Sequence, residues 1–223
     1  MTPKRTLLSW SSGKDSAWSL HVLRQDPEID VIGLVTTINA EFQRVAMHAV
    51  RVSLLQQQAD AVGLPLWKIA LPYPCSNADY ESIMSAFITE ILQQGVTHMA
   101  FGDLFLEDIR AYRERQLADT GITPIFPLWG LPTDKLGKTL IQAGVKSVLT
   151  CVDPKQLARE YCGMPYDHFL LSALPSTVDP CGEKGEFHTF VYDGPMFQYP
   201  IGIEISEIVE RDGFVFADVL PAS

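Results

Sequence analysis

The chain has no long hydrophobic run, no excess of basic residues and no CxxC pair. None of its apolar stretches reaches the roughly 18 residues that a membrane-spanning helix needs. The N-terminal segment MTPKRTLLSW also lacks the long apolar region and the small-residue cleavage site of a signal peptide. We therefore expect a cytoplasmic protein with no membrane partner.

Cysteine use and charge exclude further classes. The four cysteines are widely spaced, which predicts reduced thiols and not a disulfide framework or a zinc site. With 17 Lys and Arg against 27 Asp and Glu, the formal net charge is -10. A protein that holds nucleic acid mainly by neutralising phosphates is therefore not expected. The composition does not decide the oligomeric state, and a homo-oligomer stays open.

What the chain does have is a regular alternation of apolar, β-rich runs and helical spacing over its first two thirds. This alternation predicts an α/β fold with a doubly wound parallel sheet. Pro and Gly become dense after residue 121, which predicts a boundary near residues 130–135. We expect a domain over 1–130 and a smaller C-terminal α+β domain over 131–223. The expected strands are 5–10, 30–37, 66–71, 97–102 and 147–152, and the expected helices are 15–25, 43–62, 77–94, 104–118 and 133–143, with Gly63 and Gly95 as C-terminal stops.

Small and polar residues are concentrated where the first strand gives way to the first helix. A Gly-containing turn before a helix N-terminus presents unpaired N–H groups to an anion, and serine hydroxyls and a lysine add donors and charge. The alternative is an ordinary polar turn in which Ser12 or Asp15 caps the helix. The residues concerned are Ser11, Ser12, Gly13, Lys14, Asp15 and Ser16.

The same stretch, SSGKDS, resembles the SGGxDS loop of the PP-loop ATP pyrophosphatases, which cleave ATP between its α and β phosphates. Ser12 stands where that pattern has its second glycine. The resemblance implies that residues 11–16 bind ATP, with Lys14 as a point charge on phosphate and with Mg2+ neutralising the rest. Asp15 then either assists the metal or caps the helix.

Four later segments narrow the resemblance to the diphthine-ammonia ligase family. They are VSLLQQQADAVGLPL (52–66), FGDLFLEDIRAYRE (101–114), GITPIFPLWG (121–130) and DPCGEKGEFHTFVYDGPMF (179–197). The resemblance implies an enzyme that adenylates a carboxylate, releases pyrophosphate and aminates the intermediate with ammonium. One departure is the run Asp108-Ile109-Arg110, where the ligases typically carry Tyr-Gln-Arg.

The resemblance also implies site residues outside the loop. The adenine is expected near Thr36 and Thr37, with His48 approaching the nucleotide. Gly102 and Asp103 follow a strand at the same sheet edge, where Asp103 positions metal or ammonium or else caps the helix that follows. An anionic partner is expected at Arg110, and ammonium or acceptor recognition at Glu183 and Glu186 with Thr189 as a minor partner; the alternative for this segment is an ordinary hairpin loop.

Two other functions stay open. An RNA-modifying PP-loop enzyme is the first, although such enzymes usually add a basic RNA-binding module or catalytic cysteines. The second is a nucleotide-binding protein without turnover. The retention of Lys14, Asp15 and the C-terminal segment favours the ligase.

Overall fold

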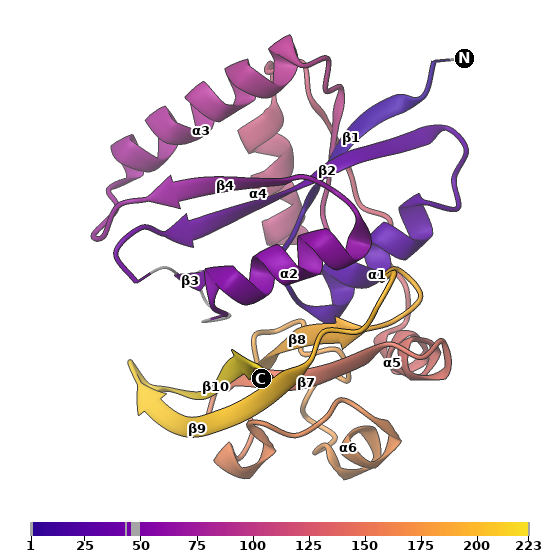
Figure 1. Cartoon of the computed structure of the whole chain (residues 1–223), viewed down its shortest axis with the longest axis vertical. Helices are drawn as coiled ribbons and strands as arrows, with labels where there is room; N and C mark the ends of the chain where they lie inside the picture. The colour runs from indigo at the N-terminus through magenta and orange to yellow at the C-terminus, as the bar shows by residue number, and fades with distance from the viewer. Residues whose placement is uncertain (1, 43, 46–49, 223) are drawn as a thin grey trace.

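The larger of two sheets, sheet A, is mainly parallel and is formed by the N-terminal part of the chain (Figure 1). The computed structural model describes residues 2–42, 44–45 and 50–222. The central strand β1 lies between β2 and β5; β6 follows β5, β4 pairs with β2, and β3 pairs antiparallel with the end of β2. The strands are β1 (Lys4–Ser9), β2 (Ile29–Asn39), β3 (Arg44–Val45), β4 (Leu66–Leu71), β5 (His98–Ala100) and β6 (Thr123–Ile125).

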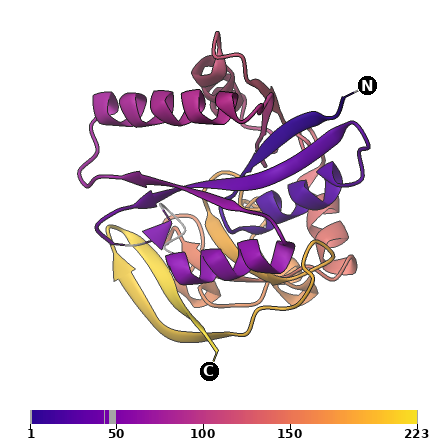
Figure 2. The ribbon, with the colours of Figure 1, turned by 45° about the horizontal axis from the view of Figure 1, so that its top comes forward.

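Helices cover both faces of sheet A, as a doubly wound sheet requires. In Figures 1 and 2, α1 and α2 lie on the side of sheet A that faces the C-terminal part of the chain, and α3 and α4 lie on the other side. Gly63 and Gly95 adopt left-handed φ values of 71° and 75° just beyond α2 and α3, which confirms them as stops. The helices are α1 (Lys14–Leu23), α2 (Val52–Val62), α3 (Asn77–Gln93) and α4 (Glu107–Leu117).

Sheet B is antiparallel, in the order β8-β7-β10-β9. The expected strand at 147–152 is real, but it belongs to this sheet and not to the parallel one. From Ser147 on, every residue of β7 is buried, and a strand buried on both faces has the same apolar pattern in either kind of sheet. The elements of this part are α5 (Thr133–Gln142), β7 (Lys146–Val152), a 3-10 turn (Arg159–Tyr161), α6 (His168–Ala173), β8 (Phe187–Asp193), β9 (Ile203–Arg211) and β10 (Phe214–Pro221).

Two expected helices begin later than the sequence predicts. The helix expected over 43–62 begins at Val52, because Arg44 and Val45 form β3 against the end of β2. The helix expected over 104–118 begins at Glu107. The N–H groups of Leu104 and Phe105 instead donate to the Glu183 carboxylate, which holds that segment outside the helix.

The two sheets share one hydrophobic core, in which β1 and α1 pack with β7 and β8. The fully buried Gln58 of α2 joins them through three hydrogen bonds. Its Oε1 accepts from Trp10 Nε1 at 2.8 Å, and its Nε2 donates to the carbonyl oxygens of Val191 and Ser12. The Val191 N–H donates to the same Ser12 carbonyl. The loop before α1 is therefore fixed from both sides.

Candidate functional site

A cleft of about 920 Å3 opens at the carboxyl ends of β1, β2 and β5. The loop 11–16 and the start of α1 form one wall, and residues 181–189 of the C-terminal part form the opposite wall. This is the edge where open α/β sheets bind ligands, since the N-termini of the crossover helices point there. Predicted residues from both ends of the chain therefore meet at one site.

The loop 11–16 presents a helix start with no side-chain cap. Gly13 is the N-cap residue, so neither Ser12 nor Asp15 caps α1 as the alternative predicted. The Ser16 hydroxyl donates to the Gly13 carbonyl at 2.9 Å and lies 3.2 Å from the Ser11 hydroxyl. Ser12, in place of the glycine of the PP-loop pattern, takes a left-handed φ of 72° and has a buried hydroxyl without a hydrogen-bond partner. The open helix start suits an anion.

Lys14 lines the cleft, but its ammonium group is directed at protein atoms. Nζ lies 2.8 Å from Asp15 Oδ2, donates to the Cys181 carbonyl, and sits over the rings of Tyr166 and Phe187. Burial, the largest single influence, lowers its pKa, but Asp15, Cys181 and Glu183 together outweigh burial and raise the pKa above the ordinary value. Its contacts therefore join the two parts of the chain, whereas the sequence predicted a charge on phosphate.

Three carboxyl groups influence one another across the cleft. Burial raises the pKa of Asp15 despite Lys14, with the charge of Asp179 as a smaller cause. Burial also raises the pKa of Asp103 despite Arg113, with the charge of Asp15 as a smaller cause. Burial also raises the pKa of Glu183 to about 7, helped by the charges of Asp15 and Asp103 and opposed by the N–H groups of Leu104 and Phe105. A carboxyl group with this pKa exchanges its proton near neutral pH.

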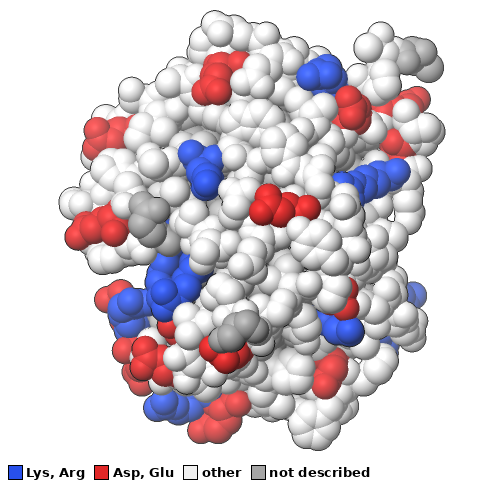
Figure 3. Space-filling model, viewed as in Figure 1, with Lys and Arg blue, Asp and Glu red and all other residues white. Residues whose placement is uncertain are grey.

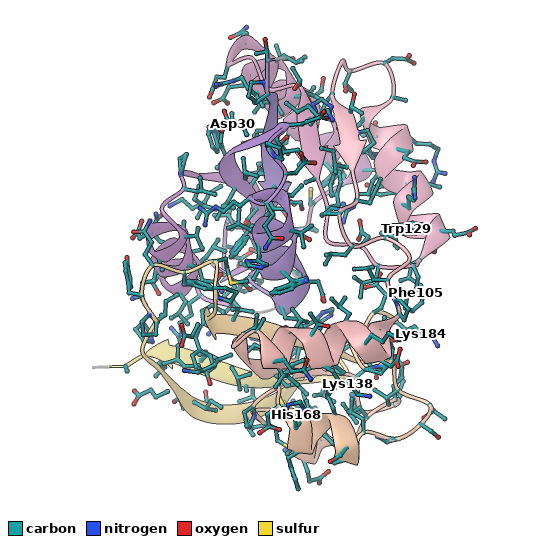
Figure 4. The ribbon with its side chains drawn as sticks, turned by 90° about the vertical axis from the view of Figure 1, so that its right-hand side faces the viewer. Asp30, Phe105, Trp129, Lys138, His168 and Lys184 are labelled. Atoms are coloured by element: carbon teal, nitrogen blue, oxygen red, sulfur yellow. The ribbon has the colours of Figure 1, made fainter. Side chains whose placement is uncertain are left out.

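The two predicted glutamates occupy different environments. Glu183 lines the cleft, and its Oε1 accepts from Leu104 N at 2.7 Å and from Phe105 N at 3.4 Å. Figure 4 shows the neighbouring Lys184 close to Phe105 at the junction of the two parts. Glu186 is 1% exposed, lies outside the cleft lining, and accepts from the N–H groups of Asp179 and Lys184. Its contacts shape the loop and leave it no access to a substrate.

Other predicted residues lie at the cleft and make structural contacts there. Thr36 donates its hydroxyl to the Trp10 carbonyl, while Thr37 is half-buried in the lining. The Thr189 hydroxyl accepts from the Lys14 N–H at 3.1 Å. Gly102 lies so close to α1 that a Cβ there would stand 3.1 Å from the backbone of Asp15 and Ser16. His48 lies outside the described residues.

Of two arginines on α4, Arg113 and not the expected Arg110 lines the cleft. Arg110 lies outside the cleft lining; its guanidinium stacks over Phe126 and Trp129 and pairs with Glu114. Arg113 lines the cleft, with its Nε 3.7 Å from Asp103 Oδ2. A helix places residues three apart about 60° from each other, so a residue three positions from a predicted one was a signal that sequence reasoning missed.

His188 was also missed as a cleft residue. Burial and the charge of Lys14 lower its pKa to about 4, so its imidazole is neutral at physiological pH.

A magnesium site at Asp15 is compatible with the donor atoms present. Asp15 Oδ1 and Asp103 Oδ2 are both buried and have no hydrogen-bond partner, and carboxylate oxygens are the ligands that Mg2+ prefers. Among the described residues, no three His, Cys, Asp or Glu side chains form a group that could hold a metal by themselves. Phosphate oxygens and water would have to complete such a site, as is usual for Mg2+.

Family models match both parts of the chain. The diphthamide synthase N-terminal domain matches residues 4–124, and the diphthamide synthase C-terminal domain matches residues 132–217. The chain belongs to the diphthamide synthase family. Similar proteins named diphthine--ammonia ligase come from cattle, mouse and zebrafish.

The cattle protein is 23% identical over 80% of this chain and 70% of its own length, and the mouse protein is 25% identical over the same shares. The zebrafish protein is 28% identical over 72% of this chain and 69% of its own length. The mainly parallel sheet A, with helices on both faces (Figure 1), agrees with the α/β fold expected from the sequence.

Two observations concern the membrane and nucleic acid partners considered above. Within the described residues, no helix is both long and apolar enough to cross a bilayer. On the face seen in Figure 3, basic side chains are interspersed with acidic ones and form no broad basic surface. That face offers no electrostatic footprint for a nucleic acid backbone.

Proposed function

We propose that this diphthamide synthase family member is an ATP-dependent ligase that adenylates a carboxylate and then aminates it with ammonia. The observation that carries the proposal is the uncapped start of α1, which shares one cleft with the half-buried carboxyl group of Glu183. The helix start suits a polyphosphate, and the Glu183 carboxyl group suits an ammonium ion or a proton transfer. The names of the similar proteins agree with a reaction that joins ammonia to a carboxylate.

In the first half-reaction, a carboxylate oxygen of the acceptor attacks the α-phosphorus of ATP. The bond between the α-phosphorus and its bridging oxygen breaks, and pyrophosphate leaves with the electron pair. The N–H groups at the start of α1 and the hydroxyls of Ser11 and Ser16 bind the phosphate oxygens. The adenine lies at the end of β2, where backbone groups near Thr37 face the cleft.

Mg2+ would be held by Asp15 Oδ1, with Asp103 Oδ2 as a second oxygen. When bound, it neutralises charge on the leaving pyrophosphate. Lys14 occupies the other oxygen of Asp15 and opposes the effect of burial on that carboxyl group, which favours its negative form.

In the second half-reaction, ammonia attacks the acyl carbon, the bond from that carbon to the AMP oxygen breaks, and AMP leaves with the electron pair. The nitrogen then gives one proton to water, which leaves the amide. Ammonium must first lose a proton, and Glu183, with a pKa of about 7, is placed to accept it. Glu186 and Arg110 have no part in this scheme, because neither lines the cleft. The division into an ATP-binding domain over 1–130 and a substrate domain over 131–223, which supplies Glu183 to the ammonium, also belongs to the proposal.

The test is to identify the products formed from ATP, Mg2+, ammonium and a candidate carboxylate labelled with 18O. We expect AMP and pyrophosphate in equal amounts, ammonium-dependent amide, and one 18O atom in the AMP. The Glu183→Gln variant should keep its affinity for ATP and lose amide formation. Formation of ADP and phosphate would contradict adenylation, and absence of any turnover would favour a nucleotide-binding protein.

A further inference from the structure

The cleft extends beyond the phosphate-binding loop into a groove between α3 and α4. Because α3 packs on β4 and α4 packs on β6, the middle of this face of sheet A forms the floor of the groove. Lining residues of α3 run from Tyr80 to Leu92, which spans about 18 Å along the helix. Met84, Ile88 and Met99 make the inner part of the groove apolar.

Arg113 stands at the polar mouth of this groove. Of the lysine and arginine side chains described, Lys14 and Arg113 line the cleft, and the Lys14 ammonium is already committed to Asp15 and the Cys181 carbonyl. The Arg113 Nε is buried and has no hydrogen-bond partner, because its 3.7 Å separation from Asp103 Oδ2 is too long for a hydrogen bond. Arg113 therefore has unused donor capacity.

The guanidinium is also held in place for a planar partner. Its carbon lies 5.0 Å from the centre of the Phe101 ring and 6.0 Å from that of Tyr112. Asp103, its ionic neighbour, directly follows Gly102, which packs against the first turn of α1. A group held by Arg113 would thus lie beside the place expected for the phosphates of ATP.

We propose that the α3–α4 groove is the acceptor site and that it takes a small monocarboxylic acid with an apolar body, whose carboxylate binds Arg113. The inference rests on the proposed ligase function and adds its substrate class. A carboxylate accepts two parallel hydrogen bonds from a guanidinium, which fixes its orientation as well as its position. The apolar body then lies along Met84 and Ile88, where it leaves water.

The size and charge of the cleft support a small acid. A volume of about 920 Å3 is near the upper end for ligand pockets and has room for a nucleotide together with a second small molecule. The acceptor carboxylate must approach a cleft that already holds Asp15, Asp103 and Glu183. Without a cation at the groove mouth it would be repelled, and Arg113 provides that cation.

The chain offers a matched control for each feature of the proposal. Arg110 and Arg113 are on the same helix, but the Arg110 guanidinium stacks over Phe126 and Trp129 outside the cleft. Ser82 and Ser85 are both exposed on α3, but only Ser85 lines the groove. The test therefore pairs Arg113→Gln with Arg110→Gln, and Ser85→Trp with Ser82→Trp.

The measurement is calorimetric titration of octanoate into each full-length protein in the presence of Mg2+ and an α,β-methylene analogue of ATP, which cannot be cleaved. We expect Arg113→Gln to weaken octanoate binding at least about tenfold, because a charge-assisted hydrogen bond is lost. Ser85→Trp should block octanoate but still admit acetate, since it fills the groove and leaves its mouth open. Both controls, and the affinity for the nucleotide analogue in all four variants, should stay unchanged.

The outcomes separate this inference from the ligase proposal. Octanoate binding that depends on Arg113, without AMP formation from ATP, would support the groove and contradict the ligase. If a diphthine peptide gives ammonium-dependent AMP formation and the Arg113→Gln variant forms AMP at the same rate, the ligase proposal is supported and the groove is contradicted. Equal effects of Arg113→Gln and Arg110→Gln, an effect confined to the nucleotide, or no octanoate binding by the parent protein would overturn the inference.

Discussion

The loops 11–16 and 179–186 face one another across the cleft, but they use their polar groups in opposite ways. The first loop closes on the hydroxyls of Ser11 and Ser16, gives α1 no side-chain cap from its N-cap residue, and leaves one oxygen of Asp15 unpaired. In the second loop, buried or half-buried carboxylates accept hydrogen bonds from the loop's own backbone. Glu186 accepts from two backbone N–H groups, and Asp179 accepts from the N–H groups of Cys181 and Glu183. A charged side chain in a motif is therefore not by itself a functional one; what matters is whether its atoms are left unpaired toward the cleft.

The largest expected effect concerns Lys14, whose ammonium group joins the first loop to the Cys181 carbonyl of the second. Lys14→Met removes the cation that compensates Asp15 and leaves the Cys181 carbonyl without its donor. We expect a loss of about 3 kcal/mol in the free energy of unfolding, the lower end for a broken buried pair because Asp15 is 25% exposed.

Urea unfolding measures this loss. The double variant Lys14→Met/Asp15→Asn should recover part of it, since no uncompensated charge remains. A double variant as unstable as the sum of the two single variants would show that Lys14 and Asp15 do not stabilise each other.

The two glutamates of the second loop allow a sharper test. In Glu183→Gln, Oε1 still accepts from both Leu104 and Phe105, because both bonds go to that one atom. In Glu186→Gln, one of two acceptors becomes an amide that faces a donating N–H group.

We therefore expect Glu186→Gln to lose about 2 kcal/mol of stability and Glu183→Gln to lose much less. Chemical denaturation at the same pH compares the two variants. Equal losses would mean that Glu186 does not organise its loop. ATP affinity should persist in folded Glu186→Gln.

Ser12 tests the strain in the first loop. Its left-handed φ of 72° disfavours a side chain, and its buried hydroxyl has no partner. Ser12→Gly should raise the free energy of unfolding by about 1 kcal/mol, after allowing for the added freedom of glycine in the unfolded chain.

Ser12→Ala is the control, because it removes the hydroxyl but keeps the Cβ. Thermal unfolding of both variants separates the two contributions. A glycine variant no more stable than the alanine variant would argue against backbone strain at this position.

The last prediction is a pH dependence of stability at Glu183. Its pKa in the folded protein, about 7, lies above the ordinary value of 4.5. Between these values the folded state binds more protons than the unfolded state, so this group lowers stability as the pH rises through that window.

Glu183→Gln abolishes the titration, and the variant should gain stability relative to the parent between about pH 5 and pH 7, within the window set by the two pKa values. Denaturation curves at the two pH values measure the gain. A constant difference would show that Glu183 ionises normally.

The local sequence pattern correctly predicted a mainly parallel sheet, most helices and the place of the loop 11–16 between β1 and α1. These features depend on residues close together in the chain: the apolar period of β1 and α1, the glycine after α2, and the run of small polar residues at 11–16. A helix pattern can be read from a single sequence because its backbone hydrogen bonds join near neighbours, and a strand pattern because successive side chains of one segment report which of its faces are buried.

It took the tertiary structure to show which sheet β7 joins, that Arg113 and not Arg110 lines the cleft, and that Glu183 lines the cleft while Glu186 is buried outside it. Strand pairing, burial and free hydrogen-bonding capacity depend on residues far apart in the chain. Lys14 is the clearest case, because its sequence position predicts a phosphate ligand, whereas the Cys181 carbonyl, 167 residues away, draws its ammonium to the opposite wall. A motif states which groups are present, and the packing around them determines which remain free to act.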